Sequence, residues 1–501
     1  MLRTVRVQEG VLEGLPAADP RITSFKGIPF ASPPVGDRRF AAPEPPLAWD
    51  GVRQAYAFAP IPLQPVQGNN PDDLYTREWH VDPDIPMDED CLYLNVWTPA
   101  KSEGEKLPVY VWFFGGGWQV GHTAEMEFDG ERLARRGIVV VTVAYRVNVF
   151  GFLAHPELTA TAPGAPTNFG LLDQRMGLEW VRDNITAFGG DPKTVTIGGQ
   201  SAGAGSVLFQ MANPDNRGLF SRAIVQSGMI SSPYGPLFPR RSMESAEAVG
   251  LDFFRVLGVQ TLEEARRLPA DYIRQKWDEY GGFEKSVMSW GPVEDGLFIT
   301  GDPLELLGSG TVPCVPLLSG YTIDEFRFPP PAKSKEELAA FIKEKFPLKA
   351  DSLLASLGYP DAPFPQVVEN ATVNVVECAL HQFGRQLQGT VPFWAYEFAV
   401  DIPGWDNPGR FHSVDLWFTF ETLAKCWRPF TGRHYDMARQ IANYWAAFIK
   451  TGNPNCEDVT GEQQSPWRSY TKADPVLMRF GDSCEAQPAT LAPVLQVLLE
   501  E

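Results

Sequence analysis

Apolar residues occur along the chain in short runs that are separated by longer amphipathic stretches. Residues 92–97 alternate as in a half-buried strand, whereas residues 109–114 and 138–143 are almost continuously apolar. Continuous runs of this length are typical of central parallel strands that helices cover on both faces. A helical stretch follows at residues 171–188. Strands that alternate with helices in this order predict an α/β fold with a mostly parallel central sheet.

Two helical blocks interrupt this alternation. The first lies at residues 243–285, and the second runs from 335 to 358 and continues at 370–388. Such excursions from a sheet are where a lid or a pocket wall would be built, so we expect helical insertions around an active site. The chain of 501 residues contains no linker, low-complexity segment or repeat. One domain is therefore predicted to span residues 1–501.

The most informative motif is a G-x-S-x-G sequence at residues 199–203, with Ser201 at its centre. A β-branched strand pattern precedes it at residues 194–197, and a buried helix pattern begins at residues 206–211. A serine at the apex of a tight turn from strand to helix is the arrangement called a nucleophile elbow. Glycine is needed on both sides because a Cβ cannot be accommodated where the strand turns sharply into the helix.

A serine hydroxyl needs a base that removes its proton and an acid that orients the base. In hydrolases with this elbow the chain order is serine, acid, histidine, so the base must follow Ser201. Among the three later histidines, His381 falls in a helical pattern and His434 begins a helix. His412 lies in a turn-like segment directly before an apolar run, so it is the favoured base.

The acid is predicted from its position after a strand. Residues 315–320 form a strand pattern that ends at a glycine, and Asp324 and Glu325 follow just beyond it. Sites in open α/β sheets gather outside the carboxyl ends of the strands. This argument selects the pair of carboxylates and leaves the choice between them open.

Three consecutive glycines at residues 115–117 follow the apolar run 109–114 directly. Glycines leave backbone N–H groups unobstructed, so these groups can point at an oxygen that becomes negatively charged during a reaction. The sequence therefore predicts an oxyanion hole at the end of this strand.

Charge and cysteine content restrict the partners and the compartment. The chain has 43 basic and 62 acidic residues, a formal net charge of −19. This balance argues against nucleic acid and anionic membranes as partners. No stretch approaches the ~20 apolar residues of a membrane-spanning helix. The first residues lack the apolar segment of a signal peptide, so we expect a cytoplasmic protein. The six cysteines have no metal-binding spacing, and we expect neither a metal nor another cofactor.

These residues carry a resemblance to the type B carboxylesterases, a family that includes the cholinesterases and bacterial para-nitrobenzyl esterases. The resemblance covers nearly the whole chain. It rests on six segments, at residues 25–31, 89–95, 168–174, 188–192, 226–228 and 450–455. It implies an α/β-hydrolase fold and a small-molecule ester as substrate, and it leaves the oligomeric state open.

The resemblance also implies a role for each matching residue. The elbow serine matches Ser201, the family's glutamate matches Glu325 rather than Asp324, and the family's histidine, which precedes an acidic residue and an aromatic run, matches His412. The family's oxyanion donors match the backbone N–H groups of Gly116, Gly117 and Ala202. A family serine that hydrogen-bonds near the acid matches Ser227.

Four positions depart from the family pattern. Gln200 replaces the glutamate before the serine, which removes a buried charge and is expected to leave catalysis unaffected. Phe114 stands where related hydrolases often have histidine, and Phe326 replaces the glycine after the acid, which is expected to narrow the pocket. Cys91 matches a cysteine that forms a disulfide in secreted members, but the partner region at residues 58–64 contains no cysteine. We therefore expect all six cysteines to be reduced, with Cys456 and Cys484 as the pair that could still meet.

The sequence thus predicts a serine carboxylester hydrolase that cleaves small to medium carboxylic esters through an acyl-enzyme on Ser201. A hydroxycinnamoyl (feruloyl-type) esterase with the same triad is a second hypothesis. A catalytically inactive, cholinesterase-like binding module is a third, and it is disfavoured because all three triad positions are filled.

Overall fold

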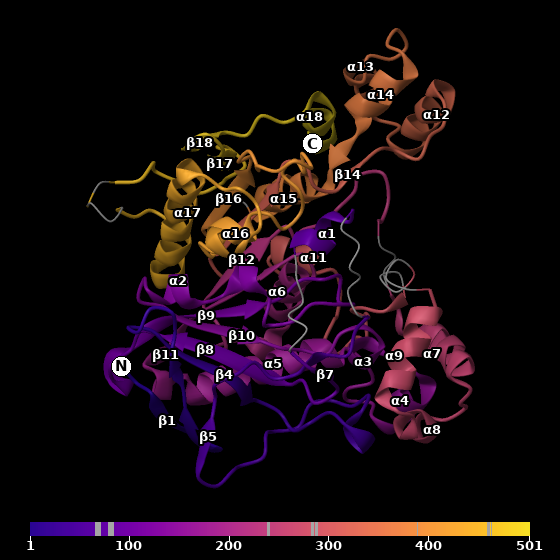
Figure 1. The fold of residues 1–501 in the computed structure, drawn as a ribbon. Coiled ribbons are helices and arrows are strands. Elements are labelled where there is room, and N and C mark those ends of the chain that lie inside the picture. The colour runs from indigo at the N-terminus through magenta and orange to yellow at the C-terminus, as the bar shows by residue number, and fades with distance from the viewer. Residues whose placement is uncertain are drawn as a thin grey trace.

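An eleven-stranded sheet runs through the protein in the computed structural model (Figure 1). The structure describes residues 1–65, 72–78, 85–237, 241–281, 285, 289–387, 389–457, 461 and 463–500. From one edge to the other the strands are β18 (Cys484–Pro488), β17 (Val476–Phe480), β16 (Phe393–Phe398), β13 (Leu317–Thr322), β12 (Arg222–Gln226), β11 (Gly190–Gln200), β9 (Leu107–Phe113), β10 (Val139–Val143), β8 (Tyr93–Thr98), β4 (Thr23–Pro29) and β3 (Leu15–Pro16). The strands from β17 to β10 are parallel, and the strands at both ends are antiparallel.

The continuously apolar runs form the centre of this sheet, as the sequence predicts. β9 and β10 pair in parallel, with Val141 opposite Val111, and every residue of β10 is buried. Burial of all side chains along a strand requires cover on both faces, because successive side chains point to opposite sides. The mostly parallel α/β architecture is therefore confirmed.

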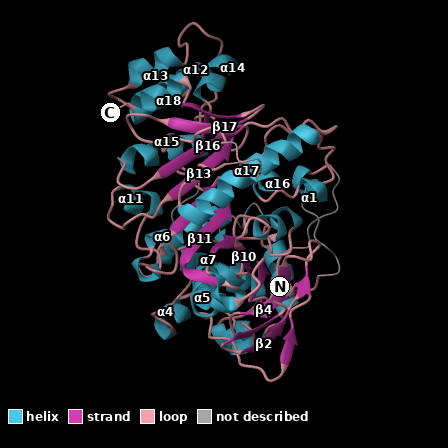
Figure 2. Ribbon diagram, turned by 90° about the vertical axis from the view of Figure 1, so that its left-hand side faces the viewer, coloured by secondary structure: helices cyan, strands magenta, loops and turns pink. Residues whose placement is uncertain are grey.

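Helices cover this sheet on both sides. The long helices are α5 (Phe169–Asn184), α6 (Ala202–Ala212), α15 (Val375–Leu387) and α17 (Gly432–Thr451), and shorter ones are α2 (Glu131–Ala134), α11 (Pro303–Gly308) and α16 (Leu416–Thr419). In Figure 2 the strands run between α11 and α15 on the left and α16 on the right. α6 packs on β9, β11 and β12, and α17 packs on β9 and β11.

Both predicted helical insertions are present and lie at separate corners of the molecule (Figure 1). The first contains α7 (Met243–Leu257), α8 (Leu262–Arg267) and α9 (Ala270–Glu279), and the second contains α12 (Lys335–Lys345), α13 (Ala350–Ser356) and α14 (Phe364–Ala371). Each has an apolar core of its own beside the main core. The second core also includes residues of α18 (Pro493–Leu499), near the end of the chain. The second insertion leaves the sheet through β14 (Arg327–Phe328) and returns through β15 (Val373–Asn374), which pair with each other.

Shorter elements complete the described chain. They are β1 (Thr4–Val7), β2 (Gly10–Glu13), β5 (Val52–Gln54), β6 (Ile61–Pro62), β7 (Met87–Asp88), α1 (Leu74–Glu78), α3 (Asn148–Phe152) and α4 (Pro156–Thr161).

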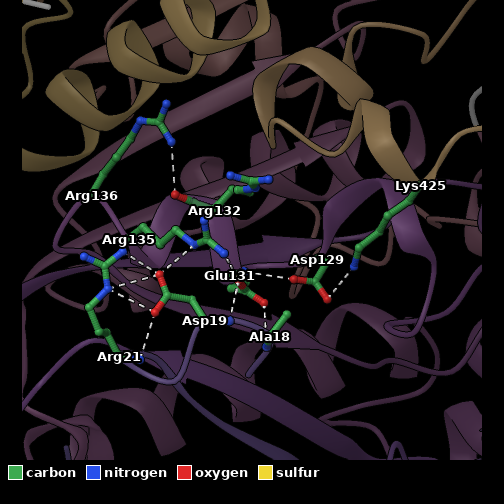
Figure 3. A network of polar contacts seen from close by, with 9 residues as sticks. All are labelled: Ala18, Asp19, Arg21, Asp129, Glu131, Arg132, Arg135, Arg136 and Lys425. Atoms are coloured by element: carbon green, nitrogen blue, oxygen red, sulfur yellow. Dashed lines mark hydrogen bonds and ion pairs between the residues drawn. The ribbon is translucent and has the colours of Figure 1, made fainter. Parts of the chain in front are cut away.

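A polar network fixes α2 against the loop that joins β3 to β4 (Figure 3). The carboxylate of Glu131 accepts hydrogen bonds from the backbone N–H groups of Ala18 and Asp19, at 3.0 and 3.1 Å. Asp19 in turn pairs with Arg135 at 3.3 Å. The side chains of Asp19, Glu131 and Arg135 are 8%, 13% and 30% exposed, so the network lies just beneath the surface and ties the loop to α2.

None of the six cysteines, all of which lie among the described residues, is joined to another in a disulfide. Burial raises the pKa of the Cys91 thiol well above its ordinary value. Among the helices built from described residues, none combines the length and the apolar character that crossing a bilayer requires. The cytoplasmic location stays a prediction.

A buried ion pair joins the loop after β10 to α5. Arg146 donates through its backbone N–H, Nε and Nη2 to the carboxylate of Asp173, at 3.0, 2.8 and 2.7 Å. The side chains are 4% and 0% exposed. Removal of one partner from such a pair leaves an uncompensated charge away from water.

Asp173→Asn should therefore lower the free energy of unfolding by about 3–5 kcal/mol, the usual consequence of breaking a buried pair. The matched control is Asp183→Asn, which removes an ion pair with Arg182 whose side chains are 49% and 36% exposed. That change should cost less than about 1 kcal/mol. Urea unfolding followed by circular dichroism measures both, and equal losses in the two variants would contradict the assignment.

Candidate active site

Ser201 lies at the junction of β11 and α6, in the predicted turn. Its φ is 56° and its ψ is −124°, a conformation that residues with a Cβ rarely adopt. A Cβ built on Gly199 would overlap the backbone of Gly203, and one built on Gly203 would overlap the carbonyl of Phe113. Both flanking glycines are therefore required by close backbone approach. The helix begins at Ala202, four residues before the predicted apolar stretch.

The triple-glycine loop packs directly against this serine. A Cβ added to Gly115 would lie 3.2 Å from Cβ of Ser201, and Gly116 and Gly117 adopt φ values of 104° and 64°. Within the described part of the chain, the backbone N–H groups of Gly116, Gly117 and Ala202 donate to no protein acceptor. The three predicted oxyanion donors thus remain free for a ligand beside the serine.

The structure brings His412 and Glu325 together from segments that are far apart in the chain. Nδ1 of His412 lies 2.5 Å from Oε2 of Glu325. The side chain of Glu325 is fully buried, and Oε1 accepts a hydrogen bond from the backbone N–H of Thr322 at 2.9 Å. An ionised carboxylate can only accept, so in the tautomer that pairs with it Nδ1 is the donor and Nε2 of the uncharged ring keeps a lone pair. The lone pair is what a base at this position needs.

The other candidates have different partners. Asp324 accepts from the backbone N–H of Arg410 at 2.8 Å, and its side chain is 41% exposed. His381 lies 2.9 Å from the hydroxyl of Tyr470, and burial lowers its pKa to about 3. His434 accepts from the backbone N–H of Thr431 at the start of α17. The geometry therefore favours Glu325 and His412 over these alternatives.

Ser227 is buried at the end of β12, but its predicted hydrogen bond near the acid is not present. Its backbone N–H donates to the carbonyl of Gly320 at 2.9 Å, whereas Oγ has no partner among the described residues. β13 therefore forms a hydrogen bond with the backbone of Ser227 but not with its hydroxyl.

Sequence reasoning missed a second buried carboxylate behind the histidine. Asp415 is fully buried and accepts hydrogen bonds from Gln226 at 3.0 Å and from the hydroxyl of Tyr396 at 2.8 Å. Burial raises its pKa to about 6, and the charge of Glu325 adds to this shift. The sequence feature that could have indicated this carboxylate is its position, since Asp415 follows His412 by three residues.

Two of the departures from the family pattern contact His412 directly. The side-chain nitrogen of Gln200 lies 3.1 Å from Nε2 of the histidine, so this position borders the candidate base, and the expectation that the substitution leaves catalysis unaffected stays a prediction. The ring of Phe326 lies 4.4 Å from the imidazole, centroid to centroid. Phe326 adopts a φ of 43°, in the region that favours glycine. No hydrogen bond joins the Ser201 hydroxyl to His412 in the described structure.

Comparisons with known proteins show the family of the chain. A family model described as "Carboxylesterase family" matches residues 2–492. This chain belongs to the carboxylesterase family. It is 31% identical to an acetylcholinesterase of Bungarus fasciatus over 530 residues, which cover 98% of this chain and 84% of the relative. It is 32% identical to an acetylcholinesterase of Electrophorus electricus over 539 residues, with 94% and 83% covered.

The solved structures that superpose on this chain are esterases as well. A PNB esterase superposes with a TM-score of 0.80 at 30% identity, with 100% of both chains covered. A carboxylesterase of Geobacillus stearothermophilus superposes with a TM-score of 0.78 at 30% identity, with 99% of this chain and 100% of the other covered. The fold is the α/β-hydrolase fold, and the protein is a carboxylester hydrolase.

The position of the acid in this esterase can be tested by paired substitutions. Glu325→Gln should lower kcat strongly, by roughly the 10⁴-fold seen when the orienting acid of a triad is made neutral, because His412 loses the partner that fixes its tautomer. Asp324→Asn, the matched neighbour, should change kcat less than about threefold, since its partner is the Arg410 loop. Steady-state hydrolysis of p-nitrophenyl acetate compares them, and equal losses would place the acid one residue away.

Asp415 makes stability depend on pH. In the folded protein the pKa of its carboxyl is raised from 3.8 to about 6. The protonated carboxyl therefore contributes fully to the free energy of unfolding below pH 3.8, where the unfolded chain is protonated too. This contribution is lost as the pH rises through about 6. Asp415→Asn removes the ionisation. Relative to the unchanged protein, the variant should gain about 1–2 kcal/mol of unfolding free energy between pH 5 and pH 8. Urea unfolding at both pH values tests this, and a difference that is the same at both would contradict it.

Proposed function

We propose that this carboxylesterase hydrolyses small to medium carboxylic esters through an acyl-enzyme on Ser201. The observation that carries the proposal is the contact of 2.5 Å between His412 Nδ1 and Glu325 Oε2, because an acid on Nδ1 orients the ring and leaves Nε2 as the nitrogen that accepts a proton. The conformation of Ser201 at the apex of the turn supports its role as the nucleophile.

The reaction proceeds in two halves. In the first, Oγ of Ser201 attacks the ester carbonyl carbon while its proton passes to Nε2 of His412. The resulting imidazolium then donates that proton to the leaving alkoxide as the carbon–oxygen bond breaks, which releases the alcohol and leaves an acyl-serine. In the second half, water attacks the acyl carbon, again with His412 as the base, and the carboxylic acid and free serine are formed.

Electrostatic stabilisation of the tetrahedral intermediates comes from backbone donors. The N–H groups of Gly116, Gly117 and Ala202 have no competing protein acceptor among the described residues. Ala202 follows Ser201 directly, and Gly116 and Gly117 follow Gly115, which packs against Cβ of Ser201. Ala202 is also the first residue of α6, so the positive end of the helix dipole adds to the stabilisation of the oxyanion. Removal of one such donor from a hydrolase typically lowers kcat by roughly 10²–10³-fold.

The substrate class is proposed from the relatives and from the walls of the site. The names of the solved relatives point to aryl and benzyl esters as test substrates. Phe326 and Trp118 are half-buried aromatic side chains next to His412 and to the oxyanion glycines, and they suit an ester with an apolar acyl or alcohol part. A panel of p-nitrophenyl esters with increasing acyl length, together with p-nitrobenzyl acetate and methyl ferulate, separates a general carboxylesterase from a feruloyl-type enzyme.

The nucleophile has a direct test. Ser201→Ala should lower turnover of p-nitrophenyl acetate by roughly 10³-fold or more, because the covalent intermediate can no longer form. A fluorophosphonate probe should label the unchanged protein at Ser201 and should not label the variant. Ser309→Ala, at an exposed serine, is the matched control and should keep full activity and labelling. A Ser201→Ala variant that keeps its turnover would overturn the proposal.

A further inference from the structure

The contact between Gln200 and His412 has an unusual geometry. The side-chain nitrogen of Gln200 lies 3.1 Å from Nε2 and 3.5 Å from Nδ1 of the same imidazole. An atom in the ring plane, in line with the lone pair of Nε2, would be much farther than 3.5 Å from Nδ1, because Nδ1 lies across the ring from that lone pair. The amide group therefore lies over the face of the ring, and the in-plane lone pair of Nε2 stays available. Gln200 is 3% exposed, so the contact is shielded from water.

The charges around His412 are concentrated on one side of the site. Glu325 contacts Nδ1 from the end of β13, and Asp415 interacts electrostatically with the ring from the start of α16. From α1, Tyr75 is close enough to Glu325 for burial and that charge to raise its pKa to about 12, so its phenol is neutral. The remaining charged groups on the surrounding segments are already paired, Asp324 with Arg410 and Glu78 with Arg428.

On the side of the elbow, by contrast, the imidazole faces an uncharged amide. An amide carries no net charge in either orientation, whereas a carboxylate at the same place would attract the imidazolium and hold the proton on the ring. A histidine that keeps its proton cannot accept another one from a serine. The charge at position 200 is therefore expected to influence the proton affinity of His412.

We propose that Gln200 is a positioning residue that supports the imidazole ring of His412 and, because it is neutral, keeps this base free of a proton at lower pH than a carboxylate at position 200 would. The proposal rests on the proposed role of His412 as the base. Its expected consequence is an acid limb of the pH profile that lies at lower pH than in a variant with a carboxylate at position 200.

The first test is Gln200→Glu, compared with the unchanged protein in pH profiles of kcat/KM for p-nitrophenyl acetate. The midpoint of the acid limb should move up by roughly one pH unit or more, since an opposite charge within this distance favours the imidazolium by that amount. Below the midpoint, activity at a fixed pH should then fall about tenfold or more. Gln366→Glu, which adds the same charge at an exposed position of α14, should leave the midpoint unchanged because solvent screens it.

The second test is Gln200→Met, which keeps the length of the side chain and removes the amide. The midpoint should stay within about 0.3 pH units, because neither side chain is charged. The value of kcat should fall about two- to fivefold with little change in KM, the factor that matches the weak interaction of an amide N–H with the face of a ring. If Gln200→Glu does not fold, as judged by circular dichroism, the Met variant carries the test alone, and wild-type kcat in that variant overturns the positioning role.

Failure of this inference can be distinguished from failure of the proposed function. The rate of fluorophosphonate labelling of Ser201, measured against pH, reports on the base without turnover. If Ser201→Ala and His412→Ala are inactive but the midpoint of folded Gln200→Glu coincides with that of the unchanged protein, the charge argument at position 200 is wrong while the triad stands. If His412→Ala keeps full activity, the base itself is misassigned and both proposals fall.

Discussion

The backbone turn at Ser201 is the constraint on which the rest of the site depends. A residue with a Cβ is held at a φ of 56°, which is sterically unfavourable unless the surroundings determine it. The carbonyl of Gln226 on β12 accepts the N–H of Ser201 at 2.9 Å, and the triple-glycine loop after β9 packs against its Cβ. Strand ends on both sides of β11 therefore hold the turn.

Buried negative charge behind His412 is stabilised by hydrogen bonds rather than by cations. Glu325 accepts from the N–H of Thr322 and contacts His412, while Asp415 accepts from Gln226 and Tyr396. Cationic partners would stabilise the carboxylates so fully that little attraction would remain for an imidazolium that forms during the reaction. Burial raises the pKa of Asp415 to about 6, because the hydrogen bonds from Gln226 and Tyr396 offset only part of the cost of removing the charged carboxylate from water.

Local patterns in the sequence predicted the sheet and the elbow because both depend on neighbouring residues. Continuous apolar runs gave β9 and β10, and G-x-S-x-G gave the turn. The acid was undecided between Asp324 and Glu325 until the family resemblance was used, since adjacent positions share one strand end and only tertiary contacts separate them. The contact between Gln200 and His412 was missed because the two residues are 212 positions apart, and no local pattern reports a neighbour at that separation.

Four of the eleven described non-glycine residues with a positive φ lie at the same edge of the sheet. Ser201, Ser227, Phe326 and Ser413 have φ values of 56°, 51°, 43° and 80°, although none is glycine. They follow β11, β12 and β13 or flank His412, so each lies where the chain must change direction abruptly to bring a side chain to one point. Such conformations cost roughly 1–3 kcal/mol each, and they persist because the buried strands behind them offset that cost. The wide parallel sheet therefore does more than position the site, since its packing supplies the free energy that keeps these turns strained.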